Sequence, residues 1–387
     1  MGHWSRLKSR AAITWLQSDA FLTQSNHWRD RVAGGCLARD RNSAYHRPRV
    51  IYSSNQTEDA GKDARVPKTR QIIAIVGPTA SGKSELGIEV ALRLNGEIIN
   101  CDSVQVYQGI QIATAKVPLE ERRGIPHHLI DFVSPSQTFT AVDWARVAID
   151  TIREIEARGR TAILVGGTGF YLRALRRPFF PSPSTDEDLR RRLSEIRERC
   201  GSEHLHKILQ RFDKAEADKL NARDWPRVQR AIEFYLQTRT RISVHRPLRP
   251  QPPEIAHRIR VVALNPPRDE LYTRINARTE KHFADGLVEE VRELLCDGVP
   301  ANSSALGAHG YRRVVEYLHG DRDLKSAVEQ TKLDVRHYAK RQLTWFRREP
   351  GVQWVEGFGD DHVLQRNVLK LLTGTTMDEN SEQEKSL

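Results

Sequence analysis

The 387-residue sequence contains only four cysteines and no long hydrophobic run. Cys36, Cys101, Cys200 and Cys296 are scattered, with no C-x-x-C pair and no His/Cys cluster at metal-ligand spacing, which argues against a zinc site or a disulfide framework. We interpret them as free buried thiols in a reducing, cytosol-like compartment. No run approaches the roughly 20 apolar residues of a membrane span, so we expect no membrane anchor.

Acidic residues are outnumbered, because 61 Lys and Arg face 50 Asp and Glu, giving a formal net charge of +11. Such an excess points to a polyanionic partner without distinguishing nucleic acid from other anions. Residues 1–67 hold eleven of the basic and six of the acidic side chains, so nearly half of the excess lies there. The rest of the chain is only mildly basic.

Sustained hydrophobic periodicity is absent from residues 1–67, which are rich in Arg, Ser, Asn and Gln. We therefore expect a disordered or dispensable N-terminal extension. An organellar transit peptide is an alternative, but Asp19, Asp30 and Asp40 argue against that acid-poor class, and a cytoplasmic location is favoured. The polar residues 374–387 predict a disordered tail.

Three short apolar runs indicate buried parallel strands, at residues 71–76, 97–101 and 161–165. Helices are expected at 83–94 and at 141–157. The second helix would bury one face, formed by Val142, Ala145, Ile149 and Ile152. Alternation of strands and helices is typical of an α/β fold with a parallel sheet.

The sequence changes in character at residues 178–257, which read as charged helices opened by a Pro/Ser-rich turn and closed by PLRPQPP. We interpret this segment as an inserted helical domain. Its first helix is expected to begin with a capping box, since Ser184 and Glu187 have the required spacing. Residues 258–264 would return the chain to the sheet, so the core is predicted from residues 68–177 and 258–373.

The residues GPTASGKS form a G-x-x-x-x-G-K-S motif between a predicted strand and a predicted helix, the context that a phosphate-binding P-loop requires. Its glycines let backbone N–H groups surround phosphate oxygens, Lys83 supplies a positive charge, and Ser84 can bind Mg²⁺. The predicted fold is therefore a P-loop NTPase-like parallel sheet flanked by helices. The predicted phosphate-binding residues are Gly77, Pro78, Thr79, Ala80, Ser81, Gly82, Lys83 and Ser84.

Asp102 follows the second predicted strand at its carboxyl end, the edge at which open α/β sheets bind ligands. A carboxylate there is suited to act as a general base or to bind a metal. An aspartate at a strand end is equally suited to cap a turn or the next helix. The position alone leaves both interpretations open.

Seven further blocks follow the P-loop in order, and all eight together resemble the tRNA dimethylallyltransferase family. The seven are DSVQVYQGIQIATAKV, IPHHLIDFVSPSQTFTAVDW, LVGGTGFYLRAL, RVQRAIEFY, LYTRINART, HGYRRV and YAKRQLTWFRR. They lie within about residues 70–355, and an ordered match of this length is far more specific than a P-loop alone.

The resemblance implies roles for the matching residues. Asp102 corresponds to the general base that takes a proton from the exocyclic amine of adenine as N6 attacks C1 of dimethylallyl pyrophosphate. Lys83, Ser84 and Arg278 correspond to groups that grip the pyrophosphate, and Thr168 to a residue that lines the reaction channel. The positions matching tRNA-contacting residues are Asp102, Ser103, Val104, Gln105, Arg190, Pro226, Arg227, Val228, Gln229 and Arg230.

The same resemblance implies the substrates. The acceptor would be the adenosine directly 3′ of the anticodon, in the anticodon stem-loop of tRNAs that read codons beginning with U, and the enzyme would be a Mg²⁺-dependent monomer. The chemistry agrees, because a P-loop with Mg²⁺ and arginine stabilises the leaving pyrophosphate, and a carboxylate assists a poorly nucleophilic amine.

Some positions depart from the family pattern or have two interpretations. Val104, Ala113 and His309 stand where the family usually has Arg, Gly and a small or apolar residue. Arg274 is either a second pyrophosphate contact or a solvated helix charge, and we favour the latter. The basic residues of 332–348 favour a surface for RNA over a merely solvated face.

Two other functions share these features. A P-loop small-molecule kinase would have the same fold, Mg²⁺ and a strand-end aspartate acting on a hydroxyl group. A catalytically silent RNA-binding protein would retain the fold, but the intact Lys83, Ser84, Asp102 and Arg278 argue against it.

Overall fold

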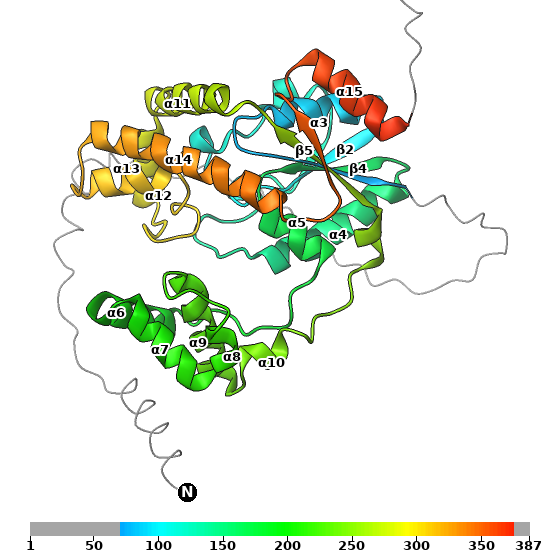
Figure 1. Ribbon diagram of the computed structural model, residues 1–387. Coiled ribbons are helices and arrows are strands. Elements are labelled where there is room, and N and C mark those ends of the chain that lie inside the picture. Colours follow the sequence, from blue (N-terminus) through cyan, green and yellow to red (C-terminus); the bar gives the residue numbers. More distant parts are fainter. Residues whose placement is uncertain (1–69, 375–387) are drawn as a thin grey trace, which may run out of the picture. The chain divides into compact units, whose positions relative to one another are not determined.

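The computed structural model describes residues 70–374, which divide into two compact units (Figure 1). Pro178–Gln251 forms the helical unit, and residues 70–177 together with 252–374 form the sheet unit. The predicted return to the core at residue 258 is the last residue of a short 3-10 helix, η4 (Glu254–Arg258), whereas the sheet unit already resumes at Pro252 and η4 contacts its α5. The predicted extension 1–67 and nearly all of the predicted tail lie outside the described residues.

The sheet unit contains one parallel six-stranded sheet with the order β3-β2-β4-β1-β5-β6. The strands are β1 (Ile72–Val76), β2 (Gly96–Asn100), β3 (His127–His128), β4 (Thr161–Gly166), β5 (Ile259–Asn265) and β6 (Val352–Glu356). Every residue of β1 is buried, as expected for a central strand covered on both faces. The predicted fold class is confirmed, and the strands β3 and β6 at the two edges were not predicted.

Helices cover both faces of this sheet. The helices are α3 (Lys83–Arg93), α4 (Ala141–Ala157), α5 (Gly169–Arg176), α11 (Arg268–Ala284), α12 (Leu287–Cys296), α13 (Tyr311–Leu318), α14 (Leu324–Phe346) and α15 (His362–Thr373). Figure 1 shows α3 and α15 on one side of the sheet and α4 and α5 on the other. The short 3-10 helices η2 (Ile112–Thr114) and η3 (Leu119–Arg122) lie in the connection from β2 to β3. None of the helices in residues 70–374 has the length and apolar character needed to cross a membrane.

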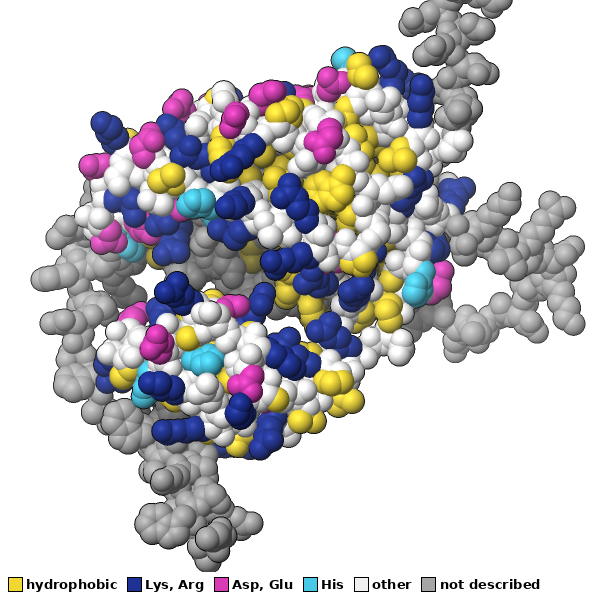
Figure 2. All heavy atoms as spheres, viewed as in Figure 1, with side chains coloured by type: hydrophobic (Ala, Val, Ile, Leu, Met, Phe, Trp, Pro, Cys, Tyr) yellow, Lys and Arg dark blue, Asp and Glu magenta, His cyan; other side chains and the backbone are white. Residues whose placement is uncertain are grey.

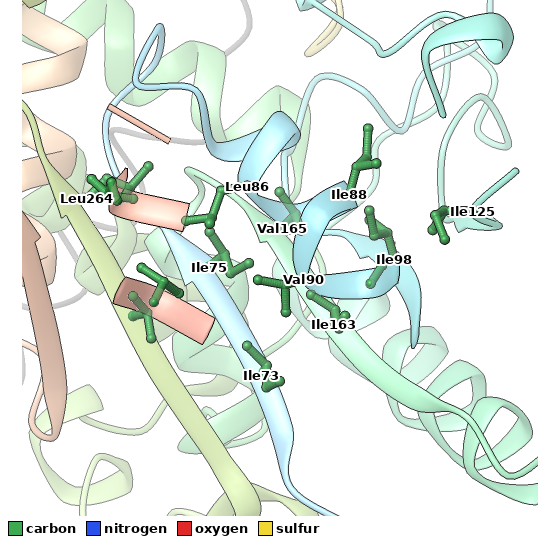
Figure 3. Packing of buried hydrophobic residues seen from close by; sticks show 14 residues of the cluster. Ile73, Ile75, Leu86, Ile88, Val90, Ile98, Ile125, Ile163, Val165 and Leu264 are labelled. Atoms are coloured by element: carbon green, nitrogen blue, oxygen red, sulfur yellow. The ribbon is translucent and has the colours of Figure 1, made fainter. Parts of the chain in front are cut away.

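The main core lies between α3, α15 and the sheet. Leu86 and Val90 of α3 pack against Ile73, Ile75 and Ile163 of the central strands (Figure 3). On the opposite face α4 has the predicted bounds, but its buried face differs from the prediction. Val142 is 59% exposed, and the buried residues are Ala141, Trp144, Ala145, Ala148, Thr151, Ile152 and Ile155.

The helical unit has a separate core. It consists of α6 (Glu187–Cys200), α7 (Ser202–Phe212), α8 (Lys214–Ala217), α9 (Trp225–Thr238) and α10 (Ile242–His245). Leucines of α6 and α7 pack on Val228 and Ile232 of α9. The predicted capping box is wrong, because Asp186 is the N-cap and its side chain accepts a hydrogen bond from the Leu189 N–H. Cys200 is exposed, unlike Cys101, which is buried as predicted.

Candidate active site

A cavity of about 1070 Å³ lies in the sheet unit, at the carboxyl ends of β1, β2 and β4. Its walls come from the P-loop, from the segment after β2, and from α11 and α14. Of the predicted site residues, those lining the cavity are Thr79, Ala80, Ser81, Gly82, Lys83, Ser84, Asp102, Ser103, Val104, Gln105 and Arg278. Sites in open α/β sheets occur at this edge because the loops that follow the strands converge there.

The loop between β6 and α15 packs against the P-loop. Gly82 has φ +77°, and a Cβ added there would lie 2.7 Å from the backbone N of Asp360, so glycine is required on both grounds. The Gly359 N–H donates a hydrogen bond of 2.8 Å to the Ser81 carbonyl. The Ser81 hydroxyl is buried without a hydrogen-bond partner among the described residues, and Ser81 lines the cavity. A buried orphan hydroxyl in a P-loop is suited to a phosphate oxygen.

Lys83 and Arg278 bring two positive charges to the cavity. Lys83 Nζ donates to the Pro78 carbonyl at 2.6 Å, and Arg278 Nη2 donates to Thr79 Oγ1 at 3.1 Å. Burial lowers the pKa of Lys83 to about 8, an effect that Asp102 opposes and Arg278 reinforces. Burial also lowers the pKa of Arg278, again opposed by Asp102, but guanidinium remains protonated. The three groups therefore form one electrostatically coupled set.

The Asp102 carboxylate caps a turn, which is one of the two roles that its sequence position left open, and its role as a base stays a prediction. Its Oδ1 accepts hydrogen bonds from the backbone N–H groups of Val104 at 2.9 Å and Gln105 at 3.4 Å, which is the turn-capping role. Its backbone is fixed by Asn100, whose Oδ1 accepts from the Asp102 N–H at 3.0 Å. Within residues 70–374 no hydrogen bond reaches Oδ2. That oxygen is therefore available to accept a proton in the cavity.

Thr168 is bonded to Ser103, which lines the cavity, and its implied role in the reaction channel stays a prediction. Its Oγ1 accepts a hydrogen bond of 2.9 Å from the Ser103 N–H and lies 3.3 Å from Ser103 Oγ. The Thr168 N–H donates to the Cys101 carbonyl at 3.1 Å. Thr168 thus fixes the segment that carries Asp102.

The positions of the helical unit that are predicted to contact tRNA differ in exposure. Val228 and Gln229 are buried, so their side chains face the core of the unit. Arg190 and Arg230 both pair with the buried Glu233, at 3.0 Å and 3.3 Å. The Arg227 side chain is 65% exposed, and among residues 70–374 its ion pair is with Asp224, at 3.3 Å. Arg227 is therefore the arginine of this set that is best placed to meet a ligand, and tRNA contact by the segment stays a prediction.

Arg274 and the basic residues of 332–348 differ in their exposure and in their ion pairs. Arg274 is a partly solvated helix charge, in line with the favoured interpretation, since its side chain is 43% exposed, pairs with Asp360 at 2.7 Å and lies over the Phe358 ring. On α14, Lys332 is buried and pairs with Glu280 and Glu329. The exposed basic residues of the predicted RNA-binding stretch are Lys340, Arg341, Arg347 and Arg348. Figure 2 shows Lys and Arg side chains distributed over the visible face of both units.

A model of the IPP transferase family matches residues 105–349 of this chain. The chain belongs to the IPP transferase family. It is 46% identical over 289 residues to a tRNA dimethylallyltransferase of Solibacter usitatus, covering 75% of this chain and 94% of the relative. It is 44% identical to a tRNA dimethylallyltransferase of Geobacter metallireducens, covering 75% of this chain and 93% of that relative.

Solved structures agree with this membership. The full-length tRNA isopentenylpyrophosphate transferase of Bacillus halodurans matches with a TM-score of 0.59 and 36% identity, covering 79% of this chain and 96% of that one. A eukaryotic dimethylallyltransferase acting on tRNA matches with a TM-score of 0.63 and 26% identity, covering 81% and 82% of the two chains.

Several lining residues of this IPP transferase were not singled out from the sequence. Lys116 donates to the Tyr107 carbonyl at 2.7 Å and pairs with Asp131, and burial lowers its pKa. His282 lies one helical turn after Arg278, and burial lowers its pKa to about 4. Gln342 of α14 reaches the P-loop from far along the chain. Their roles were not apparent from the sequence, because His282 and Gln342 are brought to the cavity by the packing of α11 and α14, and Lys116 by the segment after β2. The three departures from the family pattern, Val104, Ala113 and His309, all line it as well.

Proposed function

We propose that this chain is a tRNA dimethylallyltransferase, which transfers a dimethylallyl group from dimethylallyl pyrophosphate to N6 of the adenosine directly 3′ of the anticodon. The observation that carries the proposal is the convergence of Asp102, Lys83 and Arg278 on one cavity that also contains the P-loop. Membership of the IPP transferase family supports it. A cavity of about 1070 Å³ has room for a flipped adenine beside an allylic pyrophosphate.

In the proposed reaction, the proton is accepted on one side of this cavity and the negative charge of the leaving pyrophosphate develops on the other. As N6 forms its bond to C1 of the allyl group, the bond from C1 to the pyrophosphate oxygen breaks and the amine loses a proton. Asp102 Oδ2 accepts that proton, since Oδ1 is engaged by the turn. Lys83, Arg278 and the N–H groups at the start of α3 stabilise the charge that grows on the leaving pyrophosphate.

Mg²⁺ fits the P-loop end of this site through Ser84. Residues 70–374 contain no cluster of three or more His, Cys, Asp or Glu side chains suited to a metal, but Mg²⁺ typically uses one or two protein oxygens together with substrate phosphates and water. When bound there, Mg²⁺ would neutralise pyrophosphate charge.

Purified full-length protein tests this function. It is incubated with Mg²⁺, dimethylallyl pyrophosphate and unmodified tRNA with adenosine 3′ of the anticodon, and the tRNA nucleosides are then identified by mass spectrometry. We expect N6-dimethylallyl adenosine, and no product from the same tRNA carrying guanosine at that position. A parallel incubation with ATP tests the kinase alternative, and phosphate transfer without allyl transfer would overturn the proposal.

The helical unit is the proposed grip on the anticodon stem-loop, with Arg227 as its best-exposed candidate. A basic side chain of this kind contacts phosphates, and base flipping into the cavity needs such contacts to offset its cost of a few kcal/mol. The cytoplasmic location and the monomeric state expected from the sequence remain part of this proposal.

A further inference from the structure

Helix α14 packs tightly against the loop that joins β4 to α5. Gln342 and Trp345 lie three residues apart and therefore on one face of the helix. A Cβ on Gly167 would overlap Gln342 Nε2, and a Cβ on Gly169 would overlap the indole of Trp345. The Gln342 and Trp345 side chains thus fill the space beside Gly167 and Gly169, the two residues that flank Thr168 in the sequence.

Gln342 also reaches the P-loop. Its Nε2 donates to the Gly167 carbonyl at 2.9 Å, and its Oε1 accepts from the Thr79 N–H at 2.8 Å. Only one orientation of the amide satisfies both groups, because a carbonyl needs a donor and an N–H needs an acceptor. The side chain is 4% exposed, so neither backbone group has water as a ready substitute.

These contacts complete a path between the two sides of the reaction. Thr79 belongs to the loop proposed to hold the donor pyrophosphate, and its hydroxyl accepts from Arg278. Gly167 adjoins Thr168, which binds the Ser103 N–H next to Asp102. The Gln342 amide is therefore the direct hydrogen-bonded link, among the described residues, between the P-loop and the segment that supports the base.

We propose that Gln342 is a positioning residue for the transfer reaction, which sets the separation between the pyrophosphate-binding loop and the Asp102 segment. This inference rests on the proposed function. Attack of N6 on C1 requires the two reactants to be held close together and in line, and a misplacement of about 1 Å can lower the rate about 10²-fold. The Gln342 side chain can thus control the rate through the two loops that it joins.

Two variants of similar size separate hydrogen bonding from space filling. Gln342→Met keeps the volume and loses both hydrogen bonds. Gln342→Glu keeps an acceptor for Thr79 but turns an oxygen toward the Gly167 carbonyl. We expect the single-turnover rate of allyl transfer to fall about 10- to 100-fold in both. Binding of inorganic pyrophosphate with Mg²⁺, measured by calorimetry, should weaken in both and more in Gln342→Glu, which adds negative charge.

Phe346→Leu is the matched control, because Phe346 lies on the same helix, is fully buried and does not line the cavity. Its melting temperature should fall while its single-turnover rate and pyrophosphate affinity stay within about twofold of the parent. The tRNA dissociation constant should also stay within about twofold in all three variants. A general loss of stability would instead affect Phe346→Leu as much as the Gln342 variants.

The inference is overturned if Gln342→Met transfers at the parental rate, since a residue that merely fills space would tolerate methionine. It is equally overturned if both Gln342 variants bind pyrophosphate as the parent does. The pyrophosphate measurement needs no transfer activity, so it still tests the link if the parent fails to modify tRNA. That failure would count against the proposed function alone.

Discussion

The two carboxylate oxygens of Asp102 have different surroundings, and this difference determines which substitution is informative. Oδ1 holds the N–H groups of Val104 and Gln105, while Oδ2 has no hydrogen-bond partner in the described part of the chain. Alanine removes both functions at once. Asparagine retains an acceptor for the turn and removes the proton acceptor, so it isolates the base.

Asp102→Asn should therefore lower the single-turnover rate about 10²- to 10⁴-fold. The tRNA dissociation constant should change by no more than a few-fold, because few phosphate contacts are lost. Rapid-quench kinetics with saturating tRNA provide the measurement. An unchanged rate would exclude Asp102 as the base, and a large loss of tRNA affinity would show that it acts mainly through the turn.

The lowered pKa of Lys83 leads us to expect that pyrophosphate binding depends on pH. Its pKa is lowered to about 8 by burial, so in the free protein it is cationic below that pH and neutral above it. An anion binds the cationic form, and the affinity for pyrophosphate should therefore fall as the pH rises through about 8. Lys83→Arg is the control, since arginine stays charged and reveals the titration of pyrophosphate itself. Identical pH profiles for parent and variant would contradict the shift.

The same shift has a consequence of opposite sign for folding. An unfolded lysine titrates near its ordinary pKa of 10.5, so between about 8 and 10.5 the unfolded chain binds more protons than the folded chain. The contribution of Lys83 to stability therefore rises with pH across that window.

Residue-level prediction from the sequence is strongest where the chemistry is local. The P-loop could be read from eight adjacent residues, because its glycines, lysine and serine act through neighbouring backbone groups. Gln342 could not, since its partners Thr79 and Gly167 lie far away in the chain. Thr168 is an intermediate case, because the hydrogen bond from Ser103 to its side chain was not predictable from the sequence and its role in the reaction channel stays a prediction.

At the scale of elements, helix ends depend on single side chains. Asp186 accepts a hydrogen bond from the Leu189 N–H, whereas no such bond involves the Ser184 side chain in the described structure. Both residues had suitable types for an N-cap, and spacing alone favoured the wrong one. The energetic difference between them is open to a direct test.

Asp186→Ala should destabilise the helical unit by about 0.5–2 kcal/mol, the usual cost of losing an N-cap. Ser184→Ala should have almost no effect, because its backbone carbonyl, which accepts from Gln237, is retained. Thermal unfolding by calorimetry, with the unit's transition followed separately, distinguishes the two. Equal effects would show that the cap contributes nothing specific.

Helix α4 shows why a buried face can be misassigned while the bounds are correct. The predicted stripe included Val142, but Trp144 is buried and its indole N–H donates to the Asn100 carbonyl at 2.9 Å. That contact with the end of β2 turns Trp144 toward the sheet and Val142 toward solvent. An apolar stripe on a short helix fixes rotation only within about one residue, and packing against the sheet decides it.

At the scale of the whole molecule, the helical unit needs a test that separates binding from stability. Arg227→Ala should raise the Michaelis constant for tRNA and reduce the magnitude of the salt slope of tRNA binding by up to about one, as expected for one lost phosphate contact. The constant for the allyl donor should not change. Arg230→Ala should instead lower the melting temperature, because it leaves the buried Glu233 with fewer partners.

An unchanged tRNA affinity in Arg227→Ala, at two salt concentrations, would count against the helical unit as the RNA grip. Loss of affinity only in Arg230→Ala would point to the architecture of the unit. The different exposure of the two arginines distinguishes these outcomes, and that exposure could not be predicted from the sequence.

The strand order determines when each edge of β1 can pair during synthesis. β1 lies between β4 and β5, and β5 (Ile259–Asn265) comes after the whole helical unit. During synthesis, β1 therefore emerges early and keeps one unpaired edge until the last third of the chain is made. The helical unit, with a hydrophobic core of its own, can fold in the meantime. Until Ile259–Asn265 is synthesised, the nascent sheet has the kind of unpaired apolar edge that can pair with other chains.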